Sequence, residues 1–328
     1  VEEWCERAQP RRPATRPVAP PEAATVTLLV GDALRVLRRL PDRRFQCCVT
    51  SPPYWRQRDY RTPGQIGWER TPEPYAAKLV AVLREVRRTL RDDVLLFVNI
   101  GDAYGGRSRR RGGTGHPSTG TGDNTRTARA TRTPALHGGI KDKELLLIPH
   151  RFALAAQADG WLLRSDIIWH KTACLPESVR DRPTGAHEHV FMLAKRPDYF
   201  WDAKAIAEPA SPASAARYGY PFGNARPGRG RTAVNGTRAA DGTRNARDVW
   251  SIPAAGGAGG AHPAMMPREL AERCLRAASR PGDEVLDPFG GAGTTALAAA
   301  GLGRLATLIE LSPECAALAR ERLGALLR

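Results

Sequence analysis

Short runs of apolar residues alternate with helical patterns along most of the chain. Runs rich in Val, Ile, Leu and Phe are typical of strands covered on both faces, and they predict strands at 25–30, 45–49, 94–100, 161–169, 189–194, 284–287 and 306–310. Apolar residues three and four positions apart predict helices at 33–40, 74–90, 143–158, 267–278, 294–301 and 313–327. The alternation indicates an α/β fold with a mostly parallel sheet, in which 161–169 and 189–194 pair as an antiparallel ribbon.

Two long segments lack any such period. Residues 103–139 and 209–247 are rich in Gly, Thr, Ala and Pro, and each carries seven arginines against one aspartate. We expect them to be basic loops that an acidic partner orders. Residues 1–24, rich in Pro and Ala, are expected to form a disordered tail.

Composition points to the nature of that partner. The 328 residues include 50 Lys and Arg against 34 Asp and Glu, a net charge of +16, and only six of the 50 are lysines. Arginine suits phosphates and guanine edges better than lysine does, so we expect a nucleic-acid partner. A general compositional bias is the alternative, since Ala, Gly and Pro are also abundant.

Other classes are disfavoured by what the sequence lacks. No apolar run approaches the ~18 residues of a membrane span, and no secretory signal pattern opens the chain. The six cysteines form no CxxC pair, so we expect reduced, mostly buried thiols, with neither a metal site nor a disulfide framework.

A glycine-rich turn near the end of the chain predicts a site for an adenosine-bearing cofactor. Asp287 ends an apolar strand, and the turn after it opens the helix 294–301, whose N-terminal N–H groups can face a ligand. Glu310 ends the next strand, where its carboxylate can accept hydrogen bonds from ribose hydroxyls. Glycine for steric reasons alone is the alternative. A dinucleotide dehydrogenase would begin with this unit, whereas here only eighteen residues follow Glu310.

A second candidate site follows the strand 45–49. Ser51-Pro52-Pro53-Tyr54 leaves the carboxyl end of this strand, where α/β proteins place their sites. The two prolines remove N–H donors, so carbonyl oxygens and the Ser51 hydroxyl form an acceptor surface beside the Tyr54 ring. Such a corner can hold a planar amine by hydrogen bonding and stacking. A rigid turn with a buried tyrosine is the alternative.

Together, the two motifs resemble the amino-methylating DNA methyltransferases. In that family the Ser/Asp-Pro-Pro-Tyr motif is catalytic, and the motif seen here as Asp-Pro-Phe-Gly-Gly-Ala-Gly-Thr-Thr binds S-adenosylmethionine. The catalytic motif comes first, which resembles the circularly permuted β class with a Rossmann-like fold. The Thr-Ser-Pro-Pro-Tyr form resembles the cytosine-N4 subfamily, because adenine-N6 enzymes more often carry Asp at the position of Ser51.

The resemblance also implies roles for individual residues, with no metal. The catalytic residues are Ser51, Pro52, Pro53 and Tyr54. The residues that bind the cofactor are Asp32, Asp287, Phe289, Gly290, Gly291, Gly293, Thr294, Thr295 and Glu310. The residues that contact DNA are Arg107, Arg109, Arg110, Arg111, Arg226, Arg229 and Arg231. Arg182 and Glu188 are expected to pair with each other.

The same resemblance implies a division of the chain. After the tail at 1–24, the catalytic half of the methyltransferase domain covers 25–102, the basic insert 103–139, the continued domain 140–205, the target-recognition region 206–261, and the cofactor-binding half 262–328.

The function that this resemblance implies is methyl transfer from S-adenosylmethionine to N4 of cytosine in double-stranded DNA. The base flips out, Tyr54 stacks on it, and Ser51 Oγ with the Pro52 carbonyl accepts the hydrogens of the amine. The expected setting is the cytoplasm of a bacterium, or a phage, as part of a restriction-modification system with a partner endonuclease or as an orphan enzyme. A homodimer is also expected. The alternatives are adenine N6 as the target, an RNA substrate, and a non-catalytic nucleic-acid-binding protein.

Overall fold

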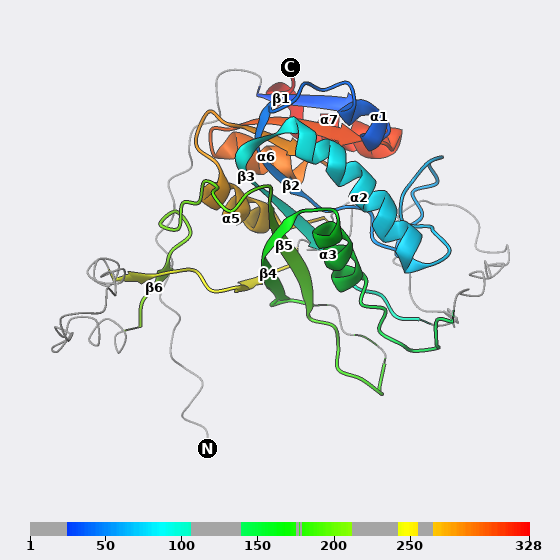
Figure 1. The fold of residues 1–328 in the computed structure, drawn as a ribbon. Helices are drawn as coiled ribbons and strands as arrows, with labels where there is room; N and C mark the ends of the chain where they lie inside the picture. Colours follow the sequence, from blue (N-terminus) through cyan, green and yellow to red (C-terminus); the bar gives the residue numbers. More distant parts are fainter. Residues whose placement is uncertain (1–24, 106–138, 175–176, 178, 212–241, 255–264) are drawn as a thin grey trace, which may run out of the picture.

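An eight-stranded sheet with the strand order β1-β10-β9-β2-β3-β5-β4-β8 forms the frame of the molecule. The computed structural model describes residues 25–105, 139–174, 177, 179–211, 242–254 and 265–328 (Figure 1). The strands of this sheet are β1 (Val26–Val30), β2 (Phe45–Thr50), β3 (Leu90–Ile100), β4 (Leu162–Lys171), β5 (His187–Ala194), β8 (Val249–Ile252), β9 (Glu284–Asp287) and β10 (Leu305–Glu310). The first five strands in the order are parallel, which confirms the expected Rossmann-like α/β fold.

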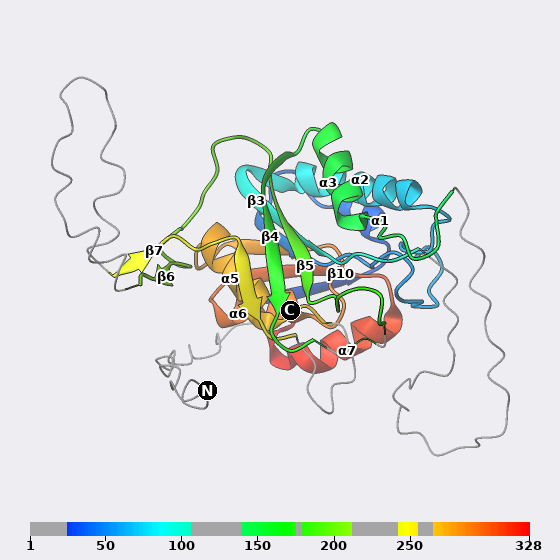
Figure 2. The same cartoon turned by 90° about the horizontal axis from the view of Figure 1, so that it is seen from below.

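Helices cover both faces of this sheet (Figure 2). The helices are α1 (Ala33–Leu37), α2 (Pro72–Thr89), α3 (Ile148–Ala158), α5 (Arg268–Ala278), α6 (Thr294–Gly301) and α7 (Pro313–Leu323), followed by a 3₁₀ turn at Gly324–Leu326. Helices α1, α2 and α3 share one hydrophobic core with one face of the sheet, and α5, α6 and α7 share a second core with the other. No helix in the described residues is long and apolar enough to cross a membrane.

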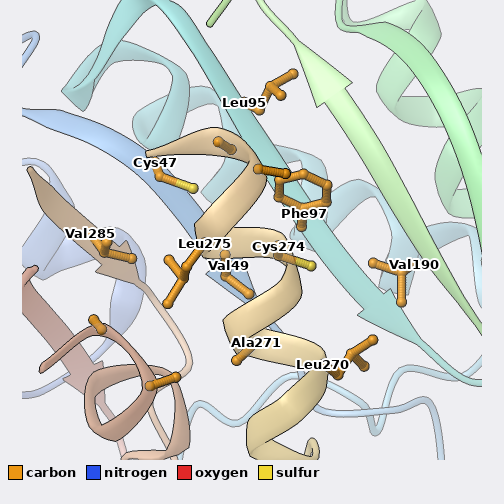
Figure 3. Packing of buried hydrophobic residues seen from close by; sticks show 14 of the residues in the cluster. Cys47, Val49, Leu95, Phe97, Val190, Leu270, Ala271, Cys274, Leu275 and Val285 are labelled. Atoms are coloured by element: carbon orange, nitrogen blue, oxygen red, sulfur yellow. The ribbon is translucent and has the colours of Figure 1, made fainter. Parts of the chain in front are cut away.

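The apolar runs are continuous because both faces of the strands are buried. In β3, Leu95 and Phe97 join the core beneath α5, whereas Leu96 and Val98 join the core beneath α2. Figure 3 shows α5 packing Ala271 and its neighbours onto these strands. No disulfide bond joins the described cysteines, of which Cys174 is exposed and the others are buried.

The antiparallel ribbon is confirmed. β5 runs antiparallel to both β3 and β4, with Ile168 opposite His189 and Trp169 opposite Glu188. β8 then pairs with β4 in parallel, so a piece of the range expected for target recognition extends the central sheet. The sequence analysis predicts no strand at this position. Strands β6 (Glu208–Pro209) and β7 (Thr243–Arg244) form a separate small sheet.

Helix α3 begins five residues later than the periodicity predicts. Leu147 has a left-handed backbone with φ of 54°, which a continuous helix does not allow. Pro149 follows within the first helical turn, where its missing N–H is tolerated. The Asp102 carboxylate accepts a hydrogen bond from Ile148 N at 2.9 Å and satisfies a free donor of this helix end.

The register brings the carboxyl ends of the parallel strands to one edge of the sheet. Val30 lies opposite Glu310, and Leu308 lies opposite Asp287. In the strand order, the chain leaves β9 for its neighbour β10 in one direction, and it leaves β2 for its neighbour β3 in the opposite direction. The boundary between β9 and β2 is therefore a topological switch point, where open α/β sheets bind their ligands.

Candidate active site

A cavity at the switch point is lined by both sequence motifs. Twelve of the thirteen expected catalytic and cofactor residues line it: Ser51, Pro52, Pro53, Tyr54, Asp32, Asp287, Phe289, Gly290, Gly291, Thr294, Thr295 and Glu310. Because β2 and β9 are neighbours in the sheet, the corner after β2 and the turn after β9 meet although they are far apart in the chain. Gly293 does not line the cavity.

Two of the glycines in the turn are explained by packing. Gly293 precedes α6 with φ of 82°, and a Cβ there would meet Leu323 Cδ1 at 3.2 Å. A Cβ on Gly290 would lie 2.9 Å from Leu308 Cβ on β10. At these two positions a side chain is disfavoured for steric reasons, because the turn packs closely against Leu308 and Leu323.

Asp287 joins the two halves of the cavity. Its side chain is buried, and Oδ1 accepts a hydrogen bond from Thr50 Oγ1 at 2.6 Å and another from Phe289 N at 3.0 Å. Burial raises the pKa of Asp287 to about 6, although these hydrogen bonds favour the ionised form. Thr50, the last residue of β2, thus ties the corner at Ser51 to the cofactor turn.

Glu310 is held between the glycine turn and the start of α7. Its Oε2 accepts from Gly291 N at 2.7 Å and its Oε1 from Ser312 N at 2.7 Å, while burial raises its pKa. A carboxylate has about four acceptor positions, so two remain for ligand hydroxyls. Asp32, at the end of the neighbouring strand, caps α1 through Arg35 N at 2.9 Å.

All four residues of the Ser-Pro-Pro-Tyr corner line the cavity. The Pro53 carbonyl accepts a hydrogen bond from Tyr75 Oη at 2.8 Å, so this oxygen already has a donor. Ser51 Oγ lies 3.4 Å from Tyr54 Oη, to which it donates. Trp55 is 2% exposed and donates its Nε1 to the Glu69 carbonyl at 3.1 Å, so it offers no face to a base.

Three polar residues, Asn99, Lys171 and Glu188, complete this corner, and no motif predicts Asn99 or Glu188 as a site residue. Tyr54 Oη donates to Glu188 Oε2 at 2.5 Å. Asn99 Nδ2 donates to the same oxygen at 3.0 Å, and Lys171 Nζ donates to Glu188 Oε1 at 2.5 Å. All three line the cavity. The predicted ribbon is the sequence feature that could have indicated Lys171 and Glu188, because its register places these two residues diagonally on one face of the ribbon.

The expected pair of Arg182 and Glu188 does not form. Arg182 Nη1 instead lies 2.5 Å from Glu177 Oε2, in the connection between β4 and β5. Lys171 is two residues beyond Trp169, the residue opposite Glu188 in the ribbon. The pairing of the two strands therefore places the Lys171 ammonium beside the Glu188 carboxylate.

Other walls of the cavity come from segments that carry no sequence signal. The loop after the corner contributes Tyr60, Thr62, Gln65 and Ile66, and Met265 and Met266 close the side before α5. These are ordinary loop residues, and only the packing of the loop brings them to the cavity.

A group of potential metal ligands lies elsewhere. The ligand atoms of His150, Asp166 and His189 are within 4.8 Å of one another, and His189 Nδ1 lies 2.9 Å from Asp166 Oδ1. His189 packs near Phe191 in the core beneath α2 and α3, and none of these three residues lines the cavity.

The arginines expected to contact DNA lie outside the described residues. These are Arg107, Arg109, Arg110, Arg111, Arg226, Arg229 and Arg231, and the tail at 1–24 lies outside them as well. Their roles stay predictions.

Comparison with known proteins gives the family. The N6/N4 methylase family, described as DNA methylase, matches residues 45–321. Type II methyltransferase M.SmaI of Serratia marcescens is 41% identical over 298 residues, covering 90% of each chain. M.Cfr9I of Citrobacter freundii is 41% identical over 306 residues, covering 93% of this chain and 89% of its own.

Solved structures agree with the fold. A DNA modification methylase, so described, of Thermus thermophilus in complex with S-adenosyl-L-methionine is 27% identical with a TM-score of 0.55, covering 92% of this chain and 95% of its own. The cytosine-N4-specific PvuII DNA methyltransferase has a TM-score of 0.61 at 19% identity, covering 92% and 86%. The chain belongs to the N6/N4 family of DNA methyltransferases.

Proposed function

We propose that this protein transfers a methyl group from S-adenosylmethionine to N4 of cytosine in duplex DNA, as the modification enzyme of a restriction-modification system or as an orphan. The observation that carries the proposal is the cavity at the switch point, where the Ser-Pro-Pro-Tyr corner meets the buried carboxylate of Asp287 and the part-buried carboxylate of Glu310. The type II names of the relatives, and the cytosine-N4 specificity in the name of the PvuII enzyme, support it.

The residues of the turn fit S-adenosylmethionine. The remaining acceptor positions of Glu310 suit two ribose hydroxyls, and Asp32 at the adjacent strand end suits the adenine side. Asp287, at the carboxyl end of β9, faces the same cavity from the side of the Ser-Pro-Pro-Tyr corner. Once bound, the cofactor supplies a methyl group that its sulfonium has already activated, so the protein needs to supply orientation rather than a Lewis acid.

The corner orients the amine. An exocyclic amino group is a weak nucleophile because its lone pair is delocalised into the ring. Ser51 Oγ and the Pro52 carbonyl accept its two hydrogens, which favours a pyramidal nitrogen aimed at the methyl carbon. The Pro52 carbonyl is the better candidate of the two proline carbonyls, since Tyr75 occupies that of Pro53. The base reaches the corner only after flipping out of the duplex, and the Tyr54 ring is the surface on which we propose that it stacks.

Mass spectrometry of nucleosides tests the proposal. DNA is purified from a methylation-free host that expresses this chain and is digested to nucleosides. DNA from the same host expressing Ser51→Ala is the control. We expect a 4-methylcytosine peak that the variant lacks. A 6-methyladenine peak would keep the fold and the donor but move the target to adenine. Neither peak, with folded protein, would contradict the proposed activity in favour of an RNA substrate or a binding role.

A further inference from the structure

We propose that Glu188 is a positioning residue that acts through Tyr54, holding Ser51 as a hydrogen-bond acceptor and receiving, along this chain of hydroxyls, the proton that leaves the amine. The inference rests on the proposed methyl transfer to an exocyclic amine. It assigns the proton a destination within the protein.

The direction of the hydrogen bonds carries the argument. Tyr54 Oη has one proton and two neighbouring acceptors, Glu188 Oε2 at 2.5 Å and Asn99 Oδ1 at 3.1 Å. A charge-assisted bond to the nearer carboxylate is the stronger of the two. With its proton committed to Glu188, Tyr54 Oη is free to accept from Ser51 Oγ, 3.4 Å away.

This direction determines the chemistry of Ser51. A hydroxyl has one donor and two acceptor lone pairs. Because the Ser51 proton points toward Tyr54, its lone pairs are left for the cavity, where they can accept a hydrogen of the amine. The long distance between Ser51 and Tyr54 is of the kind that tightens when a substrate binds.

Two donors hold the Glu188 carboxylate in place, and Tyr54 stays protonated. Lys171 Nζ at 2.5 Å and Asn99 Nδ2 at 3.0 Å both donate to the Glu188 carboxylate, whose side chain is 13% exposed. Burial and the charge of Glu188 raise the pKa of Tyr54, so the phenol stays a donor. The charged acceptor therefore stands at the end of the chain of hydroxyls.

The proton balance follows. The nitrogen lone pair forms a bond to the methyl carbon while the carbon–sulfur bond breaks, and the sulfonium becomes a neutral thioether. The nitrogen, now positive, gives one proton to Ser51 Oγ. Ser51 passes its own proton to Tyr54 Oη, and Tyr54 passes its proton to Glu188 Oε2. The products are a neutral methylated amine and a protonated Glu188, which releases the proton to water before the next turnover.

Glu188→Gln tests the proposal in the full chain with duplex DNA. The amide keeps the shape of the side chain but cannot take the proton. We expect kcat to fall about 100-fold, in the range of general-base effects, while the Kd for S-adenosylmethionine changes less than about twofold. Glu188→Asp should restore part of kcat. The matched control is Glu73→Gln on α2, an exposed glutamate paired with Arg151 at 2.6 Å, which should leave both constants unchanged.

A double variant distinguishes a proton relay that acts as a unit from contacts that contribute independently to kcat. Tyr54→Phe should lower kcat by a factor similar to that of Glu188→Gln. The double variant should be little worse than either single one, because residues that act as a unit are not additive. Fully multiplicative losses would overturn the relay.

The remaining outcomes are distinguishable. If Glu188→Gln is unstable because Lys171 loses its partner, the variant Glu188→Gln with Lys171→Met removes that charge and should fold, still with the low kcat. Unchanged kcat in Glu188→Gln would overturn the role of Glu188, as would an equal loss of cofactor binding. Absence of methyl transfer by the wild type would instead contradict the proposed function.

Discussion

Asp287 shows what one buried carboxylate does between two neighbouring strands. It accepts hydrogen bonds from Thr50 of β2 and from Phe289 of its own turn, and it is 3% exposed. These bonds place the cofactor turn relative to the catalytic corner. Burial nevertheless opposes the charge, which is why the pKa of Asp287 is raised to about 6.

Asp287→Asn is expected to stabilise the protein above pH 6. Because the pKa is raised to about 6 in the folded state, the native protein holds a proton between about pH 4 and 6 that the unfolded chain has lost. The free energy of unfolding of the wild type therefore falls as pH rises through this window. Asparagine does not titrate, so the variant avoids a loss on the order of 1–3 kcal/mol. Urea unfolding of both proteins at pH 4 and pH 8 measures this, and a less stable variant at pH 8 would contradict it.

Ser51→Ala is expected to separate chemistry from cofactor binding. Removing the hydroxyl deletes an acceptor for the amine but leaves the turn after β9 intact, so kcat should fall roughly 100-fold or more. The Kd for S-adenosylmethionine should stay within about twofold, as measured by calorimetry. Glu310→Ala should show the opposite pattern, with weaker cofactor binding. Equal losses of both quantities in Ser51→Ala would remove it from the catalytic step.

At the scale of elements, the corner after β2 depends on close contact with the end of β3. A Cβ on Gly101 would lie 2.7 Å from Tyr54 Cε2 and 3.5 Å from Glu188 Cδ. The absence of a side chain at Gly101 lets the Tyr54 ring reach Glu188 on β5. The position of the Tyr54 phenol is therefore set by the corner after β2, by the end of β3 and by β5.

Gly101→Ala is expected to displace Tyr54. The added methyl group cannot coexist with the ring at 2.7 Å, so kcat should fall roughly 10- to 100-fold, as misplacements of about 1 Å do. Cofactor affinity should change little. Gly185→Ala is the matched control, since a Cβ there would meet its nearest neighbour, Glu177 Oε1, at an ordinary 3.6 Å. Steady-state kinetics decide, and wild-type kcat in Gly101→Ala would contradict the argument.

At the scale of the whole molecule, permutation and topology fit together. The described part of the chain enters the sheet at the edge strand β1, crosses to β2, and reaches β9 and β10 only after β8. This path leaves β9 next to β2, although the motifs that follow the two strands are far apart in the chain. The net charge of the whole chain is +16, and the cavity lies at the edge of the sheet where the parallel strands end.

The basic segment 103–139 is expected to contribute phosphate contacts. Replacing Arg107, Arg109, Arg110 and Arg111 with alanine should weaken binding to any duplex and make the slope of log K against log salt shallower by about 0.9 per lost contact. Fluorescence anisotropy over a salt series measures both effects. Arg84→Ala, which removes a partner of Asp159 at 2.6 Å, is the control. An unchanged slope would show that this segment touches no phosphate.

Local patterns in the sequence were enough to predict the class of fold and two motifs that meet at one cavity. Apolar runs and helical spacing report local burial, so they predicted the parallel sheet and the ribbon within a few residues. The two motifs each follow a strand, and in an α/β sheet the carboxyl ends of parallel strands meet at one edge. Twelve of thirteen expected residues consequently share one cavity.

Contacts that depend on strand register and packing could be seen only in the folded molecule. The pairing of Trp169 with Glu188 brings Lys171 to the carboxylate and leaves Arg182 to Glu177. Likewise, the close approach of Gly293 to Leu323 of α7 follows from packing. These contacts join residues distant in the chain, and composition or periodicity in one segment cannot encode a partner in another. The motifs located the chemistry, and strand register selected the side chains that complete it.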